Sequence, residues 1–186
     1  GFVTRDKAEL PIYQFAVASG EFDSASEPNY YDGALPIRSV GKGLIPVFPK
    51  IWLYALEKEG NAIGELTTVN ENQFLVIERD GAQGPEAETK KVFLISLGEG
   101  TQVEKELLVD LLEIDNPQGL GGFEPGTFRF PFTTIEAVEI IDERTLILCN
   151  DNNFPFSTGR EPGVAEDTEF IVIRLPEPLD WTPPSF

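Results

Sequence analysis

Two clusters of acidic and amide side chains directly follow apolar runs, and their oxygen atoms are the main chemical groups of this sequence. Residues 150–153 (Asn-Asp-Asn-Asn) follow the run 146–149, and Glu-Arg-Asp at 78–80 follows the run 74–77. Such oxygens are the hard ligands that calcium prefers. The same residue types also form turns in which Asn and Asp bond to their own backbone. The first cluster therefore predicts a calcium site or a turn, and the second predicts metal ligands or ion-paired residues.

Missing residue types exclude several kinds of active site. The chain has no His, which rules out Ser-His-Asp triads, Cys-His pairs and histidine-ligated zinc. It also lacks the Gly-x-Ser-x-Gly motif of a nucleophile elbow. The single Cys149 lies in the apolar run 146–149, so no internal disulfide can form and we expect a buried structural thiol. Any hydrolytic chemistry is therefore expected to use metal-activated water.

The charge is strongly acidic, with 14 Lys plus Arg against 32 Asp plus Glu and a net charge of −18. A nucleic-acid partner needs a basic footprint, which is absent, and an anionic membrane surface would repel the chain. No apolar stretch is long enough for membrane insertion. The charge is compatible with cation binding, although most acidic residues are expected to face water. Few cationic residues lie near the acidic clusters in the sequence, where they could hold a substrate anion; the candidates are Lys50, Lys90, Lys91 and Arg160.

Short apolar runs between Gly- and Pro-rich loops predict an all-β protein. Their lengths suit strands, and their continuous apolarity indicates strands covered on both faces; they span 51–56, 74–77, 92–97, 146–149 and 170–175. Residues 103–114 have apolar positions at helical spacing, but their first half fits an outer strand equally well.

An internal repeat organises these strands. Residues 65–80 align without a gap on residues 136–151 at an offset of 71, and residues 92–97 match 170–175. Repeated four-stranded antiparallel units are typical of the blades of a β-propeller. Glu65 and Glu136 begin the first strands of their units, which in a propeller line the channel. The second unit has no obvious fourth strand, and residues 12–17 are a candidate for that place.

The length holds about three blades, whereas a closed propeller needs at least about four. We therefore predict one partial propeller domain over 1–186, which another chain or segment must complete. Within it, residues 19–50 are expected to form a long ordered loop and residues 176–186 an extended tail along the surface.

The two repeated elements together resemble the phytase-like β-propeller family, known by the label "esterase-like activity of phytase". The resemblance rests on Gln-Phe-Leu-Val-Ile-Glu-Arg-Asp at 73–80, Lys-Val-Phe-Leu-Ile-Ser-Leu at 91–97, and the segment 134–154 that ends in Asp-Asn-Asn-Phe. It covers about residues 50–175 and corresponds to the C-terminal part of such a domain. It implies a propeller with acids around the channel mouth. It also implies export, so that the protein would be secreted or periplasmic, although this chain shows no signal peptide.

The resemblance further implies calcium as the cofactor. More distant calcium-dependent phytases hold a phosphomonoester with calcium, and metal-activated water attacks it. By position, the expected metal ligands are Glu78, Asp80, Glu136, Asp151, Asn152 and Asn153. Glu136 and Asp151 are also the candidate catalytic residues, and the expected substrate-binding residues are Lys91, Arg79 and Arg160.

Three functions remain open at this point. The first is a calcium-dependent phosphoester hydrolase acting on a small anionic ester. The second is a non-catalytic, calcium-stabilised propeller that binds a protein or another ligand. The third is a structural subunit that closes a larger assembly. All three predict a partner that supplies the remainder of the propeller, either a second chain or a second copy.

Overall fold

The computed structural model describes residues 14–18, 51–153, 159–161, 163–164 and 167–183. The predicted loop over 19–50, which includes Lys50, lies outside the described residues. Within them the regular structure consists of strands and two short 3-10 turns, η1 (Gly84–Glu86) and η2 (Leu120–Gly122). The all-β prediction is confirmed.

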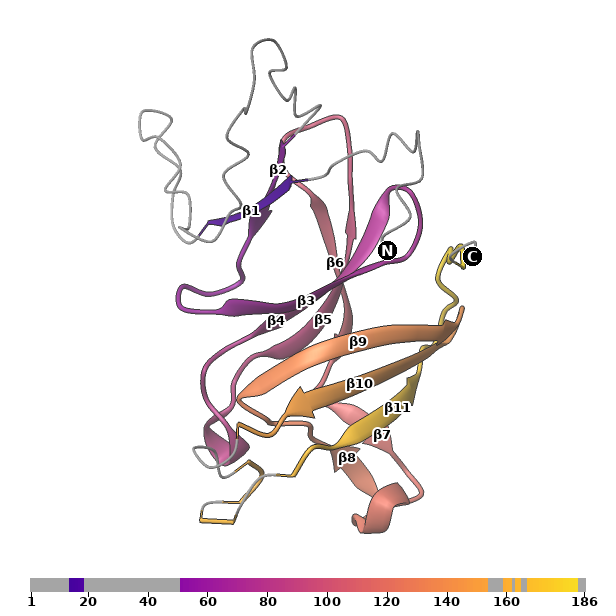
Figure 1. The fold of residues 1–186 in the computed structure, drawn as a ribbon. Coiled ribbons are helices and arrows are strands. Elements are labelled where there is room, and N and C mark those ends of the chain that lie inside the picture. Colours follow the sequence, from indigo (N-terminus) through magenta and orange to yellow (C-terminus); the bar gives the residue numbers. More distant parts are fainter. Residues whose placement is uncertain (1–13, 19–50, 154–158, 162, 165–166, 184–186) are drawn as a thin grey trace, which may run out of the picture.

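Two antiparallel sheets, which correspond to the two repeat units, form the body of the structure (Figure 1). The first sheet has the order β3-β4-β5-β6, with strands Ala62–Thr68, Gln73–Arg79, Lys90–Ser96 and Glu104–Asp110. The second sheet has the order β11-β10-β9, with β9 at Thr134–Asp142, β10 at Thr145–Asp151 and β11 at Phe170–Arg174. The segment 103–114 thus begins as a strand, and the helical alternative is wrong there.

Two smaller strand pairs accompany these sheets. β7 (Ile114–Asn116) pairs antiparallel with β8 (Gly126–Phe128), and β1 (Gln14–Ala18) pairs in parallel with β2 (Ile51–Ala55). The prediction that residues 12–17 complete the second sheet is therefore wrong, because the described part of this segment extends the β2 edge instead. The second sheet contains three strands among the described residues.

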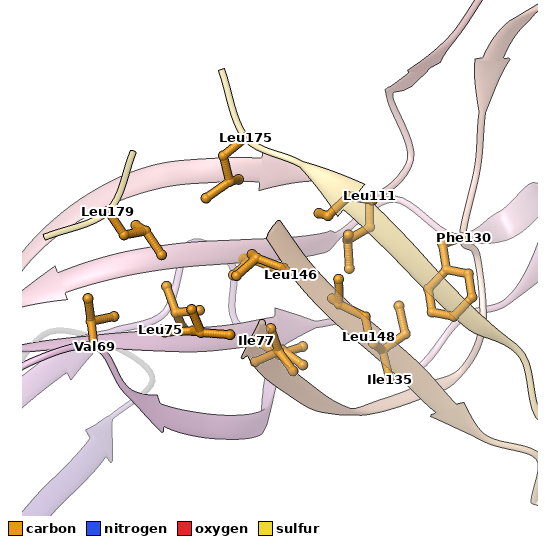
Figure 2. Packing of buried hydrophobic residues seen from close by; sticks show 14 of the residues in the cluster. Val69, Leu75, Ile77, Leu111, Phe130, Ile135, Leu146, Leu148, Leu175 and Leu179 are labelled. Atoms are coloured by element: carbon orange, nitrogen blue, oxygen red, sulfur yellow. The ribbon is translucent and has the colours of Figure 1, made fainter. Parts of the chain in front are cut away.

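The main apolar core lies between the two sheets (Figure 2). Leu75 and Ile77 of β4 and Leu146 and Leu148 of β10 are each at most 1% exposed. β4 is buried on both faces, because Phe74 and its same-face neighbours pack in a second cluster with Tyr54 of β2. Two-sided burial explains why this strand reads as a continuous apolar run.

β10 is buried on one face only, contrary to the sequence prediction. Its residues alternate between buried and half-buried positions, and Cys149 is half-buried. Beyond β11 the chain continues as far as residue 183, where the description ends, without helix or strand, and Leu179 packs into the core. The backbone N–H of Thr182 donates to the carbonyl of Val69 at 2.9 Å, which holds residues 179–182 beside the first sheet.

The sheets meet where their first strands, β3 and β9, lie side by side. The hydroxyl of Thr67 donates to the carbonyl oxygen of Val138 at 2.7 Å, and these two residues are 71 positions apart, the offset of the repeat. Nearby, a Cβ atom on Gly64 would lie 2.2 Å from the carbonyl oxygen of Ile135. Only glycine permits this close approach.

The contact at Gly64 generates a stability prediction. Gly64→Ala forces β3 away from β9, because the nearest atom belongs to backbone, and we expect a loss of about 1–3 kcal/mol in the free energy of unfolding. Gly81→Ala is the matched control, since its Cβ would meet no atom within 4 Å. Urea denaturation followed by tryptophan fluorescence measures both. Equal stability of the two variants would show that the sheets are not in contact at Gly64.

Candidate functional site

Loops from both sheets converge beyond the ends of β4 and β10, where the repeat places equivalent residues. The backbone N–H of Gly84 donates to the carbonyl of Pro131 at 2.9 Å. The hydroxyl of Thr133 donates to Oε1 of Gln83 at 2.8 Å. These contacts join the loop that follows β4 to the segment that leads into β9, so that residues distant in sequence can act at one place.

Glu78, a predicted metal ligand, is fully buried and accepts four hydrogen bonds. Oε1 accepts from the backbone N–H of Glu57 at 2.6 Å and from Nδ2 of Asn61 at 2.7 Å. Oε2 accepts from the hydroxyl of Tyr54 and from Nζ of Lys105, both at 2.7 Å. Glu78 thus fastens β4 to β2, to β6 and to the loop between β2 and β3.

This environment keeps Glu78 ionised. Burial raises the pKa of its carboxyl, but hydrogen bonds from Asn61, Lys105, Tyr54 and the Glu57 backbone outweigh burial and leave the pKa below the ordinary value. The Lys105 ammonium also lies 3.9 Å from the ring centre of Phe93 and 4.5 Å from that of Tyr54. Burial and the neighbouring carboxylate raise the pKa of Tyr54, which therefore stays protonated and donates. The assignment of Glu78 as a calcium ligand stays a prediction, but its oxygens are occupied by protein donors here.

Asp80 has a comparable role in the loop after β4. Oδ2 accepts from the backbone N–H groups of Glu88 and Thr89, each at 2.8 Å, and Oδ1 lies 2.8 Å from Nζ of Lys90. The Lys90 side chain is fully buried and also donates to the carbonyls of Asp80 and Ala82. Burial raises the pKa of Asp80, but these donors outweigh it and lower the pKa. Lys90, a candidate for anion binding, is thus part of the loop's internal structure.

Arg79, Glu136 and Asp151 are brought to the line of contact between the sheets. Nη2 of Arg79, the last residue of β4, lies 3.4 Å from Oε1 of Glu136 on β9. Asp151 ends β10 opposite Thr134, two residues before Glu136 on the same strand. Burial raises the pKa of the half-buried Cys149, and the charges of Asp151 and Glu136 raise it further. The neutral thiol is a poor nucleophile.

The Arg79 guanidinium retains unused hydrogen-bonding capacity. Its Nε is buried and has no hydrogen-bond partner among the described residues, while the side chain as a whole is 14% exposed. Buried polar atoms in native proteins nearly always have partners, so this donor calls for a ligand or water. A guanidinium with a free N–H is suited to the oxygens of a phosphate.

Within residues 150–153, Asn150 and Asp151 end β10, and the side chain of Asp151 bonds to nearby backbone as the turn alternative predicts. Oδ1 of Asp151 accepts from the backbone N–H of Asn153 at 3.4 Å, and Asn153 has a positive φ of 46°. Asn150 is buried, with Nδ2 donating to the carbonyl of Asp167 and Oδ1 accepting from the N–H of Glu169. Nδ2 of Asn153 also contacts the hydroxyl of Thr134. Asn152 is half-buried beside them, and the roles of Asp151, Asn152 and Asn153 in metal binding stay predictions.

Arg160 and Lys91 were expected to bind substrate, but neither of them joins the ion pair of Arg79 and Glu136. The guanidinium of Arg160 makes two hydrogen bonds with Glu169, at 2.8 and 2.6 Å, and another with the carbonyl of Arg129. Its central carbon also lies 4.8–6.0 Å from four ring centres, those of Phe123, Phe128, Phe130 and Phe132. Nζ of Lys91 lies 3.4 Å from Glu57. Both cations therefore have partners within the fold.

Sequence reasoning missed Tyr54, Asn61 and Lys105, which surround Glu78, and the four Phe residues around Arg160. The spacing of Phe128, Phe130 and Phe132 was a visible signal, since alternate residues of an extended segment share one face. No comparable signal exists for Lys105, because its contact with Glu78 spans 27 residues.

The described residues contain no group of three or more Cys, Asp or Glu side chains that could hold a metal ion. The best fit to calcium is the pair Glu136 and Asp151. Both are exposed, and the pairing of Asp151 with Thr134 puts them at the same end of the β9–β10 pair. Glu136 is bonded only weakly, at 3.4 Å, to Arg79. Calcium accepts water and carbonyl oxygens beside carboxylates, so two carboxylates suit a partly hydrated ion.

A family model described as "Phytase-like: Esterase-like activity of phytase" matches residues 39–154, more than half of the chain. The chain belongs to this family. The matched region includes residues 65–80 and 136–151 of the repeat, and with them Arg79, Glu136 and Asp151. No curated protein and no solved structure matches the sequence of this phytase-like chain. Within the part that the structure describes, no helix is long and apolar enough to cross a membrane.

The four hydrogen bonds that the Glu78 carboxylate accepts generate a prediction about how stability depends on pH. Its folded-state pKa lies below the unfolded value, so its stabilisation is present above about pH 4.3 and is lost as pH falls through the folded pKa. Glu78→Gln leaves Lys105 without this charged partner, and we expect a loss of about 3–5 kcal/mol at pH 7. The difference from the unsubstituted chain should shrink on acidification. Urea midpoints between pH 3 and 7 measure it.

The control is Glu106→Gln, which removes an exposed carboxylate from β6. It should change stability by about 0.5 kcal/mol or less. A loss for Glu78→Gln that does not depend on pH would contradict an ionised Glu78.

Proposed function

We propose that the chain is part of a calcium-dependent phosphoester hydrolase of the phytase-like type, in which metal-activated water attacks a small anionic phosphate ester. The family supports an esterase-like activity. The composition supports this type of mechanism, since metal-activated water requires neither a His nor a protein nucleophile, and the chain has no His.

The observation that carries the proposal is the ion pair of Arg79 with Glu136, in which the buried Nε of the guanidinium has no partner among the described residues. Arg79 would donate to phosphate oxygens, and Glu136 would hold the guanidinium in the orientation that this needs. Repulsion between an anionic ester and a chain of net charge −18 must be overcome at the site itself. One guanidinium that already pairs with Glu136 cannot do this alone, which favours a bound cation.

Glu136 and Asp151 are the residues that would hold calcium, with Asn152 and Asn153 near enough in sequence to contribute amide oxygens. When bound, calcium supplies positive charge to the phosphate and lowers the pKa of a water ligand. Glu78 and Asp80 would act indirectly. Their hydrogen bonds fix the end of β4 and the following loop, and so position Arg79 between them.

We also propose that the two sheets are neighbouring blades of a propeller. Their first strands lie side by side, as the innermost strands of blades do around a channel, and the Thr67–Val138 bond joins equivalent residues of the repeat. About three such units fit in 186 residues, so the remaining blades would come from another chain, a second copy or another segment. Export to the periplasm or the medium is part of the same proposal.

Phosphate release from phytate and from a panel of phosphomonoesters tests the activity. We expect release to require calcium and to stop on addition of chelator. Glu136→Gln and Asp151→Asn should each lower kcat/KM about 100-fold and weaken calcium binding, measured by calorimetry. Arg79→Lys should raise KM while leaving calcium affinity nearly unchanged, because lysine lacks the guanidinium geometry.

Glu106→Gln on β6 serves as the control here too and should retain full activity. Calcium binding that raises the melting temperature without turnover of any ester would favour the non-catalytic, calcium-stabilised alternative. Failure to bind calcium at all would contradict both the calcium-dependent hydrolase and the non-catalytic, calcium-stabilised alternative.

A further inference from the structure

β11 is an edge strand whose place in the repeat calls for another neighbour. Residues 170–175 correspond to residues 92–97, and in the first sheet the corresponding strand β5 is paired on both sides, with β4 and with β6. Among the described residues β11 pairs with β10 alone. Within the part of the chain that the structure describes, its outer edge therefore presents unpaired backbone N–H and C=O groups, which are a template for another strand.

A groove follows this edge. It is lined by five consecutive residues, 169–173, and consecutive residues of a strand point to opposite faces. A groove that contacts all five thus runs along the strand's edge and not over one face. The opposite wall comes from β7, β8 and the connection between them, and includes Ile114, Asn116, Leu120, Phe123 and Phe128. Figure 1 shows β7 and β8 beside β11.

The rim of the groove is apolar and exposed. Phe170 and Val172 of β11 are 67% and 62% exposed, and Leu120 and Phe123 across the groove are 67% and 41% exposed. Large apolar side chains gathered at one place on a surface mark an interaction site more often than chance exposure does. Phe170 and Val172 lie two residues apart on one face, so they would contact alternate side chains of an added strand.

The charge of the groove favours a basic occupant. The charged residues that line it are Asp115 and Glu169, and no Lys or Arg is among the lining residues. Arg160 pairs with Glu169 and lies over the rings of Phe123 and Phe128, so the negative charge that remains is that of the wall opposite β11, which carries Glu113, Asp115 and Glu124. A second copy of this chain would bring another net charge of −18 to this wall. A strand that carries Lys or Arg gains from the same field.

We propose that the edge of β11 binds an extended, basic polypeptide strand by β-augmentation, which adds a fourth strand to the second sheet. The occupant has apolar residues at alternate positions and Lys or Arg near its ends. The inference rests on the proposed interpretation of the sheets as blades, and is independent of calcium and of catalysis. In an intact ring such a strand would come from the partner that supplies the remaining blades.

The probe is a fluorescein-labelled peptide, Lys-Val-Thr-Val-Thr-Val-Thr-Lys, whose binding to the full chain is followed by fluorescence anisotropy. Leu120→Lys and Val172→Lys place a positive charge on opposite walls, and each should weaken binding about tenfold or more. Leu107→Lys is the matched control, because Leu107 is also an exposed leucine, 48% exposed, but lies on β6. It should change the affinity less than about twofold.

Two further measurements decide the mode of binding. A peptide with Pro at the central valine should not bind, because augmentation needs its backbone N–H groups. Bound peptide should slow amide hydrogen exchange in residues 170–174. No binding of the Lys peptide, or equal binding by Leu120→Lys and Leu107→Lys, would overturn the proposal.

The oligomeric state of the chain shows whether the edge of β11 binds a second copy of the chain instead of a basic strand. If the chain without peptide sediments as a dimer, and Val172→Lys dissolves the dimer, the edge binds a second copy and the basic strand is wrong. Phosphate release measured on Leu120→Lys keeps the two proposals separate. Loss of peptide binding with normal activity is the expected result, whereas absence of activity in every variant, including the unsubstituted chain, bears only on the hydrolase.

Discussion

The close approach of β3 to β9 is the constraint on which the rest of the structure depends. At Gly64 the backbone of one sheet lies where a side chain would collide with the carbonyl of Ile135. This proximity lets β4 and β10 share one apolar core, because their inner faces then lie within packing distance. It also places Arg79, at the end of β4, against Glu136 on β9. Without this contact the sheets would be separate and Arg79 would not meet Glu136.

The charges near this contact divide into two groups by the number of hydrogen bonds that they make. Glu78 and Asp80 are each stabilised by several protein donors, which lower the pKa of the carboxylate. Lys105 and Lys90 are their cationic partners. Such groups rigidify the loops after β2 and β4 and leave no capacity for ligands. Arg79, Glu136 and Asp151 are bonded less completely, and residues with unused capacity are the ones that can bind something else.

The repeat can be recognised in the sequence, but its two units are equivalent in the structure only in part. Residues 65–80 and 136–151 both form a strand, a tight turn and a second strand, as the patterns of apolar residues indicated. The sequence also grouped Glu78 with Asp80 and Asp151 as comparable acids after a strand. The structure separates them, because β4 is covered on both faces by the second sheet and by β2, whereas β10 is covered on one. Asp80 and Asp151, which occupy the same position in the repeat, are therefore a half-buried anchor in one sheet and an exposed strand end in the other.

The sequence by itself determined the all-β class, the family and the acids at the strand ends, since these depend on local periodicity and on motifs of a few residues. It did not reveal that Tyr54 and Lys105 would donate hydrogen bonds to Glu78, that Arg160 would lie among four aromatic rings, or that residues 14–18 would pair with β2. Each of these contacts joins segments that are far apart in the chain, and hydrophobic patterns specify which face is buried but not what covers it. Only the packing of the two sheets decided which acidic residues are already bonded and which remain available for a ligand.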